Sequence, residues 1–196
     1  MFKAGLLQER ARDNSFLKMV KTKKEIILDT ALDLFAEKGY DATPTSLIAR
    51  EAGVSEGLIF KHYINKENLL EAVVKAGYRR ITDKSKGLVS EDDPEKLIMN
   101  VLDMPFKLVE EEKNFWRMQF RLVDEEISQR HHARYSQSVM QTLVGAFKRL
   151  GYKEPELETE VLMLIIEGLW RHYLLNEDKE HFGKMINLIK AKYRQG

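Results

Sequence analysis

The sequence contains no cysteine, so it can form neither a disulfide framework nor a thiolate metal site, which suits the reducing cytoplasm. It also lacks a long apolar run, because the longest, Val161–Ile166, falls far short of the roughly 20 residues that span a membrane. The charged N-terminus does not have the pattern of a signal peptide. We therefore expect a cytoplasmic protein with no membrane partner.

A large excess of charge of one sign is also absent, since 32 Lys and Arg residues face 31 Asp and Glu residues. The distribution is uneven: residues 1–24 carry a net charge of +5, and the remaining residues carry −4. A basic N-terminal arm, residues 1–21, can add sequence-independent affinity for phosphates. For residues 1–18 we favour a solvated tail, and Met19 is an alternative start of the native chain.

The stretch Thr43–Tyr63, TPTSLIAREAGVSEGLIFKHY, predicts two short helices joined by a tight turn. Thr43 can cap the first helix, which we expect to start at Pro44, where a missing N–H costs nothing. Gly53 suits the left-handed conformation that ends a helix, and Ser55 can cap the second helix. So short a connection favours a helix-turn-helix unit, whose second helix enters the major groove of DNA. A structural helix corner in a larger bundle is the alternative.

The residues before this unit predict one more helix. Thr22 and Glu25 form a capping box, and the helix that they open ends before Gly39. Its apolar stripe is expected to pack beneath the helix pair. We therefore predict an all-α fold, with a three-helix N-terminal helix-turn-helix head, residues 22–66, followed by a larger helical body, residues 67–196.

Residues Gly39–Leu70, GYDATPTSLIAREAGVSEGLIFKHYINKENLL, resemble the DNA-binding region of the TetR (tetracycline-repressor) family of bacterial regulators. The resemblance is specific over about Thr22–Leu70 and includes the AGVS turn. It implies a homodimeric repressor that binds an inverted-repeat operator in double-stranded DNA and is released when its helical body binds a small-molecule effector. The DNA-facing positions that the resemblance implies are Thr45, Glu56, Gly57, Leu58, Phe60, Lys61, His62 and Lys66.

Each of these side chains suits a different contact with DNA. Lys61 can donate to guanine or to a phosphate, Glu56 can accept from cytosine, and Leu58 can touch a thymine methyl group. Thr45 and Lys66 are better suited to phosphates, which fix the register of the protein on the duplex without reading its sequence. His62 suits either role.

Two positions depart from the family pattern. Family members often carry a hydroxyl residue where Leu58 stands and a tyrosine where Phe60 stands. Phe60 has no hydroxyl to offer to a phosphate, so packing against a sugar or the neighbouring helix is the alternative for this residue. The helix as a whole is therefore a firmer prediction than any one of its contacts.

Helical periodicity continues through the body, with no strand pattern and no internal repeat. A helix is expected from Glu67 to about Ser85, followed by a loop over residues 84–93 and a new helix from Pro94. Pro105 is expected to bend or break the helix that contains it. The resemblance implies that the first of these helices links the DNA-binding head to the sensing body.

Aromatic and methionine side chains in the body are the candidates for an effector site. They suggest a small, largely apolar effector with polar anchors among His172, Arg121 and Arg171. For each residue taken singly, a place in the ordinary core is the alternative that we favour. The candidate lining residues are Met104, Phe106, Phe115, Trp116, Met118, Phe120, Tyr135, Trp170 and Tyr173.

The last two helices carry broad apolar faces at i, i+3, i+4, i+7 spacing. Two such helices from each subunit can form a four-helix bundle about a two-fold axis, as in the resembled family. Completion of an internal core is the alternative. The candidate dimer residues are Leu157, Val161, Leu164, Ile165, Gly168, Phe182, Met185, Ile186 and Ile189.

Rival functions find less support in the sequence. It contains no paired Glu-x-x-His motif, phosphate loop or nucleophile elbow, so we expect no enzyme activity, no metal and no cofactor. A second rival keeps DNA binding but uses the body to recruit a protein partner. An enclosed cavity of about a few hundred Å³ would favour sensing, whereas a packed interior with a large exposed apolar patch would favour a protein partner.

Overall fold

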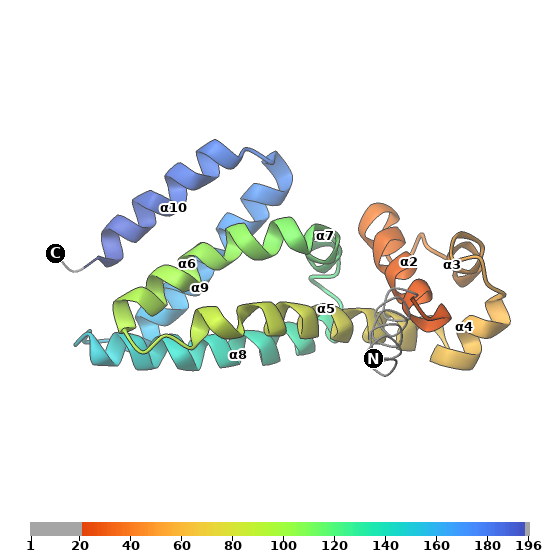
Figure 1. Cartoon of the computed structure of the whole chain (residues 1–196), viewed down its shortest axis with the longest axis horizontal. Helices are drawn as coiled ribbons and strands as arrows, with labels where there is room; N and C mark the ends of the chain where they lie inside the picture. Colours follow the sequence, from red (N-terminus) through yellow and green to blue (C-terminus); the bar gives the residue numbers. More distant parts are fainter. Residues whose placement is uncertain (1–20, 195–196) are drawn as a thin grey trace, which may run out of the picture.

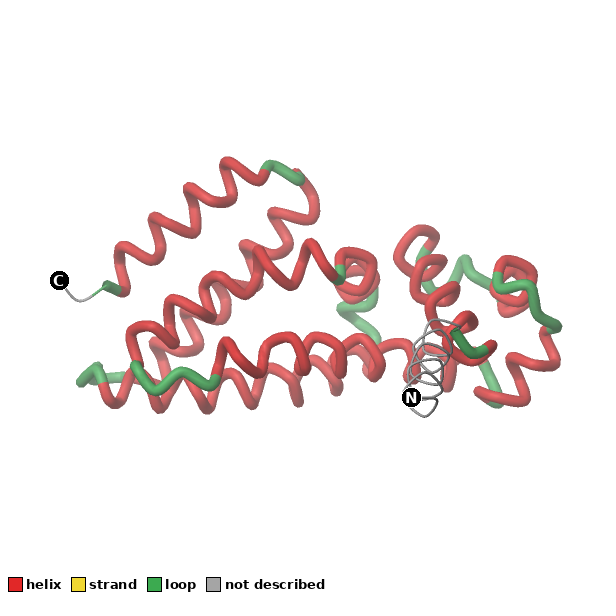
Figure 2. Tube along the Cα trace, in the orientation of Figure 1, coloured by secondary structure: helices red, strands yellow, loops and turns green. Residues whose placement is uncertain are grey.

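The computed structural model describes residues 21–194, so all but the last residue of the expected N-terminal arm lies outside the described part. Every regular element in this range is an α-helix, as predicted, and the connections are short (Figures 1 and 2). The helices are α2 (Lys23–Lys38), α3 (Thr45–Glu51), α4 (Glu56–Tyr63), α5 (Lys66–Val89), α6 (Pro94–Glu111), α7 (Lys113–Arg121), α8 (Glu126–Arg149), α9 (Pro155–Asn176) and α10 (Lys179–Tyr193).

Helices α2, α3 and α4 form a head at one end of the molecule (Figure 1). Its core is made of fully buried apolar side chains, among them Ile27, Phe35, Ile48 and Ile59. The predicted capping box is confirmed, because the Thr22 hydroxyl accepts from the backbone N–H of Glu25 and the Glu25 carboxylate accepts from that of Thr22. Local sequence signals therefore start the head, and burial of apolar surface holds it together.

The turn before α3 differs from the prediction. Thr43 does not cap the helix: its side chain is fully buried, and its hydroxyl donates to the carbonyl of Gly39 at 2.7 Å. Pro44 is the capping position instead, and α3 begins one residue later than predicted, at Thr45. The hydroxyl therefore fastens the α2–α3 turn to the end of α2, where it satisfies a carbonyl that the helix leaves without a partner.

Helix α5 connects the head to the body. Asn65 caps it by accepting from the backbone N–H of Asn68 at 2.7 Å. The helix is longer than predicted and continues through Ser85 to Val89, so the loop shrinks to residues 90–93. At 24 residues, α5 is about 36 Å long and reaches from the head along much of the body (Figure 1).

The body consists of α5 to α10. Helix α8 runs beside α5, α6 lies above them in the view of Figure 1, and α9 passes behind α6. Helix α10 packs on the outside of α6 and α9. Pro105 was expected to bend or break the helix that contains it. The helix is not broken there, because α6 is continuous from Pro94 to Glu111. Among residues 21–194, none of the helices contains a stretch long and apolar enough to cross a membrane.

The head is fixed to the body at two places. Helix α2 packs on α7, and the backbone of α5 passes so close to α7 that a Cβ atom at Gly77 would lie 2.1 Å from the ring of Phe115. Glu112, just before α7, is nearly buried and pairs with Arg80 and Lys84 of α5. Burial alone would raise the pKa of Glu112, but hydrogen bonds from these two cations hold it below its ordinary value. The start of α7 is thereby attached to the helix that carries the head.

Candidate nucleic-acid interface and body cavity

Helix α4 is anchored on one side and open on the other. Ser55 caps it, Ile59 is fully buried, and the hydroxyl of buried Tyr63 donates to the carbonyl of Lys24 at 3.1 Å. The opposite side carries four of the predicted DNA-facing residues in exposed positions: Gly57, Phe60, Lys61 and His62. The helix thus presents a small, mixed surface at the end of the molecule, away from the body (Figure 1).

Three other predicted DNA-facing residues lie where α3 and α4 begin. Thr45 donates its hydroxyl to the Glu56 carboxylate at 2.5 Å, which ties the N-terminal ends of the two helices together. Leu58 is half-buried against the core of the head, so only part of its side chain is available to a base. Any contact from Glu56 to cytosine would compete with the bond from Thr45.

The last predicted DNA-facing residue, Lys66, lies at the edge of the head. Its amino group is 4.2 Å from the centre of the Tyr40 ring and donates to the carbonyl of Asp41 at 3.5 Å. Partial burial lowers the pKa of Lys66, and Asp41 opposes this shift. The ammonium group is thereby held in place beside the head and not free in solvent.

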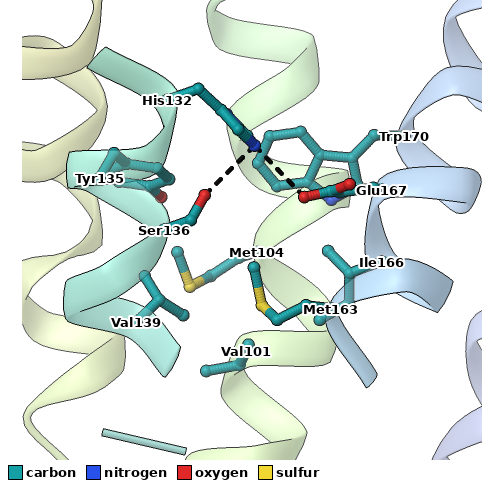
Figure 3. A pocket seen from close by; sticks show the side chains of 10 residues that line it. All are labelled: Val101, Met104, His132, Tyr135, Ser136, Val139, Met163, Ile166, Glu167 and Trp170. Carbon is teal, nitrogen blue, oxygen red and sulfur yellow. Dashed lines mark hydrogen bonds and ion pairs between the residues drawn. The ribbon is translucent and has the colours of Figure 1, made fainter. Parts of the chain in front are cut away.

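A small apolar cavity of about 40 Å³ lies in the body between α6, α8 and α9 (Figure 3). Met104 on α6, Met163 on α9 and Val139 on α8 form part of its wall, and the two methionine side chains approach each other across its centre (Figure 3). Its volume is well below the few hundred Å³ expected for an enclosed effector site. Methionine side chains are flexible, so this wall can rearrange at low cost.

A polar group sits at one edge of this cavity. His132 Nε2 lies 3.2 Å from both the Glu167 carboxylate and the Ser136 hydroxyl (Figure 3). His132 Nδ1 lies 3.0 Å from the Tyr78 hydroxyl. A carboxylate only accepts hydrogen bonds, so Nε2 carries the proton, and in a neutral ring Nδ1 accepts from Tyr78. Burial raises the pKa of Tyr78, which keeps its hydroxyl a donor. The group links α5, α8 and α9 at the cavity.

Three of the predicted effector residues, Met104, Tyr135 and Trp170, line this cavity. Trp116 lies behind them, with its ring centre 4.0 Å from that of Trp170. Phe115 and Met118 are fully buried elsewhere, Phe106 and Tyr173 pack with Phe182 of α10, and Phe120 lines a separate hollow near α2. Helical spacing predicts that these six residues belong to the body, but only tertiary packing decides whether each one faces the cavity, another part of the core or the surface.

The predicted polar anchors also lie elsewhere. Arg121 and Arg171 line the hollow near α2, and His172 is close to Asn176 on the surface of α9. His132, Ser136 and Glu167 take the polar positions at the cavity, and none of the three was predicted from the sequence. His132 on α8 and Glu167 on α9 are 35 residues apart in sequence, so no local pattern signals their meeting.

Several buried donors around the cavity have no hydrogen-bond partner. They include the indole N–H groups of Trp116 and Trp170 and the hydroxyl of Tyr135. Burial raises the pKa of Tyr135 to about 12, despite the proximity of Ser85, so its hydroxyl stays protonated. Among residues 21–194, no three His, Asp or Glu side chains gather in a way that would hold a metal ion.

The predicted dimer residues divide into two groups. Leu157, Val161, Leu164 and Gly168 form an exposed stripe along α9, with Leu164 68% exposed. Ile165, Met185 and Ile189 are half-buried, whereas Phe182 and Ile186 are buried within the single chain. Phe182 and Ile186 lie in the core of the single chain, where α10 packs on α6 and α9.

Comparisons with known proteins identify the family of the helix-turn-helix region. The family model "Bacterial regulatory proteins, tetR family" matches residues 27–73. The uncharacterized HTH-type transcriptional regulator YvkB of Bacillus subtilis (strain 168) is 34% identical over 161 residues, covering 76% of this chain and 81% of YvkB. YuxN, an uncharacterized HTH-type transcriptional regulator of the same organism, is 30% identical over 164 residues, covering 79% of this chain and 55% of YuxN.

The fold is shared with solved structures. The TetR family transcriptional regulator PfmR from Thermus thermophilus superposes with a TM-score of 0.71 at 19% identity, covering 90% of this chain and all of that one. The relatives are transcriptional regulators and not enzymes. The match over residues 27–73 covers the helix-turn-helix pair, including the exposed helix α4. This chain therefore belongs to the TetR family of DNA-binding transcriptional regulators.

Proposed function

We propose that the protein is a homodimeric repressor that binds an inverted-repeat operator and leaves it when a small molecule binds the body. The exposed surface of α4, held clear of the body by α2 and α5, is the observation that carries this proposal. Lys61 and His62 form no ion pair with any described residue, so the charge of Lys61 and the hydrogen-bonding capacity of both side chains remain available to DNA.

The stripe along α9 supports the dimer. Leu157, Val161, Leu164 and Gly168 follow one another at intervals of four, three and four residues, the spacing of a helix that packs against another helix. An exposed Leu164 costs free energy in water, and a second copy of the same stripe would cover it. A two-fold dimer would present two α4 helices to two half-sites, which are about 34 Å apart on DNA.

Selection of bound duplexes from random DNA tests the proposal directly. The expected product is an inverted repeat, because a two-fold dimer reads the same half-site twice. Selected sites without inverted symmetry would contradict the dimeric arrangement. Failure to retain any duplex at low salt would contradict DNA binding itself.

Lys61→Ala sharpens this test. If Lys61 donates to a base, the substitution should weaken operator binding by about 1–3 kcal/mol and relax specificity at one position of the half-site. If it contacts only a phosphate, binding to all sequences should weaken equally and the salt slope should fall by about 1. Titration of labelled operator and mismatched duplexes by fluorescence anisotropy separates the two results.

Lys107→Ala is the matched control, because Lys107 is an exposed lysine on α6 of the body. It should bind the operator like the unmodified protein. Circular dichroism should show the same helix content for both variants, since neither side chain is buried. An unchanged affinity of Lys61→Ala for every duplex would remove Lys61 from the DNA-binding surface.

A further inference from the structure

A groove of about 420 Å³ lies between α5 and α8, the two helices that run side by side away from the head (Figure 1). Its volume falls within the 300–1,000 Å³ that is typical of small-molecule sites, whereas the cavity of about 40 Å³ does not. Of these two spaces, the groove and not the apolar cavity is therefore large enough for a small molecule.

Positive charge surrounds this groove. Lys75, Arg79 and Lys86 of α5 and Arg134 of α8 line it, and no acidic residue does. Lys86 pairs with Asp83 at 2.8 Å, but the other three cations form no ion pair with any described residue. Like charges around one hollow repel each other and attract an anion, and arginine suits carboxylate and phosphate groups in particular.

The groove and the apolar cavity share part of their walls. Tyr135 and Val139 line both of them. The Tyr135 hydroxyl is buried without a partner, and so is the indole N–H of Trp170 on the cavity side. Both groups are donors, so the boundary between the two spaces has hydrogen bonds to offer to an acceptor oxygen. Beyond it, Met104 and Met163 form a flexible apolar wall.

We propose that the groove and the cavity together bind an amphipathic anion. Its acidic group lies on Arg79 and Arg134, and its apolar end passes Tyr135 into the space between the two methionines. The inference rests on the proposed function only in identifying this ligand as the effector. A purely apolar ligand would leave the buried donors of Tyr135 and Trp170 without an acceptor, which is unfavourable. It would also gain nothing from the attraction of the exposed cations for an anion.

The other possible role of these cations is contact with the DNA backbone. Lys75 and Arg79 also line a hollow of about 520 Å³ that reaches His62 and Tyr63 of α4. Arg134 lies on α8 and does not line that hollow, so a role in DNA contact does not account for it. The test below therefore measures DNA affinity and ligand affinity on the same variants.

Four ten-carbon probes with different head groups test the charge preference. Decanoate and decyl phosphate carry the two common anionic groups, decan-1-ol is neutral, and decyltrimethylammonium is a cation. Trp116 and Trp170 are the only tryptophans in the sequence, and Trp170 lines the cavity, so tryptophan fluorescence reports binding without DNA. At least one anion should bind about tenfold more tightly than decan-1-ol, and the cation should not compete. The preferred anion distinguishes a carboxylate from a phosphate ligand.

The double variant Arg79→Gln with Arg134→Gln removes one cation from each helix. It should bind the preferred anion about tenfold more weakly while its affinity for decan-1-ol stays the same. Lys107→Gln with Lys192→Gln removes the same charge from exposed positions outside the groove and should bind all probes like the unmodified protein. Arg79→Lys with Arg134→Lys keeps the charge and should recover most of the anion affinity.

Three results would overturn the inference. The first is equal affinity for all four probes or no saturable binding of any of them. The second is an equal loss of anion affinity in the control variant, which would assign the effect to net charge. The third is a loss of affinity for random duplex DNA in the Arg79 and Arg134 variant with unchanged anion binding, which would assign these residues to DNA. Anion binding by a protein that ignores all duplexes would contradict the proposed function and leave the inference standing.

Discussion

The head and the body differ in whether their buried polar side chains have hydrogen-bond partners. In the head, the hydroxyls of Thr43 and Tyr63 both donate to backbone carbonyls. In the body, buried polar atoms without a partner occur on α7, α8 and α9, and they account for all those found among the described residues. They are Trp116 Nε1, Gln119 Nε2, His131 Nε2, Tyr135 Oη and Trp170 Nε1.

This difference fits the roles that we propose for the two regions. An unpaired buried donor costs about 1–3 kcal/mol, so the body gives up stability that the head retains. A helix that enters a DNA groove must keep one shape, and full pairing of its supports fixes that shape. A ligand that supplies acceptors to the body would recover part of the lost free energy, which gives it a differential affinity for one state.

The largest expected change in stability comes from a substitution at the junction between the head and the body. Gly77→Ala would place a Cβ atom within 2.1 Å of the buried Phe115 ring, so α5 and α7 must separate. We expect the free energy of unfolding to fall by about 3 kcal/mol, the upper end of the usual cost of overpacking. Urea denaturation followed by circular dichroism measures this change.

Gly87→Ala on the same helix is the matched control, because nothing lies within 4 Å of a Cβ atom at that position. It should raise the free energy of unfolding by about 0.5–1 kcal/mol, since alanine loses less backbone entropy than glycine in a helix. Equal effects of the two substitutions would show that the contact between α5 and α7 does not limit the residue at position 77.

The head could be predicted from the sequence in more detail than the body. The caps at Thr22 and Ser55 depend on neighbours within three residues, so a local pattern identifies them. Thr43 was misassigned because its acceptor is the carbonyl of Gly39, and only the folded turn brings the two together. The pattern therefore suffices for a cap on the first turn of a helix, but not for a side chain that bonds backwards across a turn, even to a residue four positions away.

In the body, the sequence predicts helices but not the faces that meet. His132 and Glu167 lie on α8 and α9, and the cavity they share exists only because these helices pack at one particular rotation. Phe106 and Trp170 are both aromatic residues within helices of the body, yet the side chain of Phe106 is 41% exposed and that of Trp170 lines the cavity. Apolar periodicity shows which face of a helix is buried, but it does not show which other helix packs against that face.

Removal of one hydroxyl from the head and one from the body tests the difference between the two regions, and the expected changes in stability are of intermediate size. Thr43→Val keeps the shape of the side chain but leaves the partly buried carbonyl of Gly39 short of a donor, so the free energy of unfolding should fall by about 1–2 kcal/mol. Tyr135→Phe removes a hydroxyl that has no partner, so stability should stay the same or rise by up to about 1 kcal/mol.

Thermal and urea denaturation of the two variants decide this point. A comparable loss of stability in both would mean that the Tyr135 hydroxyl is satisfied in solution, and the contrast between head and body would fail at that residue. Tyr135→Phe should also weaken binding of the anionic probe, because the substitution removes a donor at the boundary of the groove. Thr43→Val should leave probe binding unchanged, since Thr43 lies in the head.

The smallest expected effect concerns the one strained joint in the head. Ile64, between α4 and α5, has φ 66° and ψ −54°, and the N–H of Asn65 donates to the carbonyl of Tyr63 at 2.6 Å. These features describe a γ-turn of the strained hand, which is especially unfavourable for a β-branched residue. Ile64 is also 78% exposed, so its side chain gains little from burial in return.

Ile64→Gly should therefore raise the free energy of unfolding by about 0.5–1 kcal/mol, because relief of strain exceeds the extra backbone entropy that glycine loses. Ile64→Val keeps the branched side chain and should change stability by less than about 0.5 kcal/mol. Calorimetry of the two variants tests the assignment. If glycine destabilised the protein, the turn would have to be held by its exposed side chain. The head would then depend on a contact with the neighbouring helices in addition to the buried polar pairs described above.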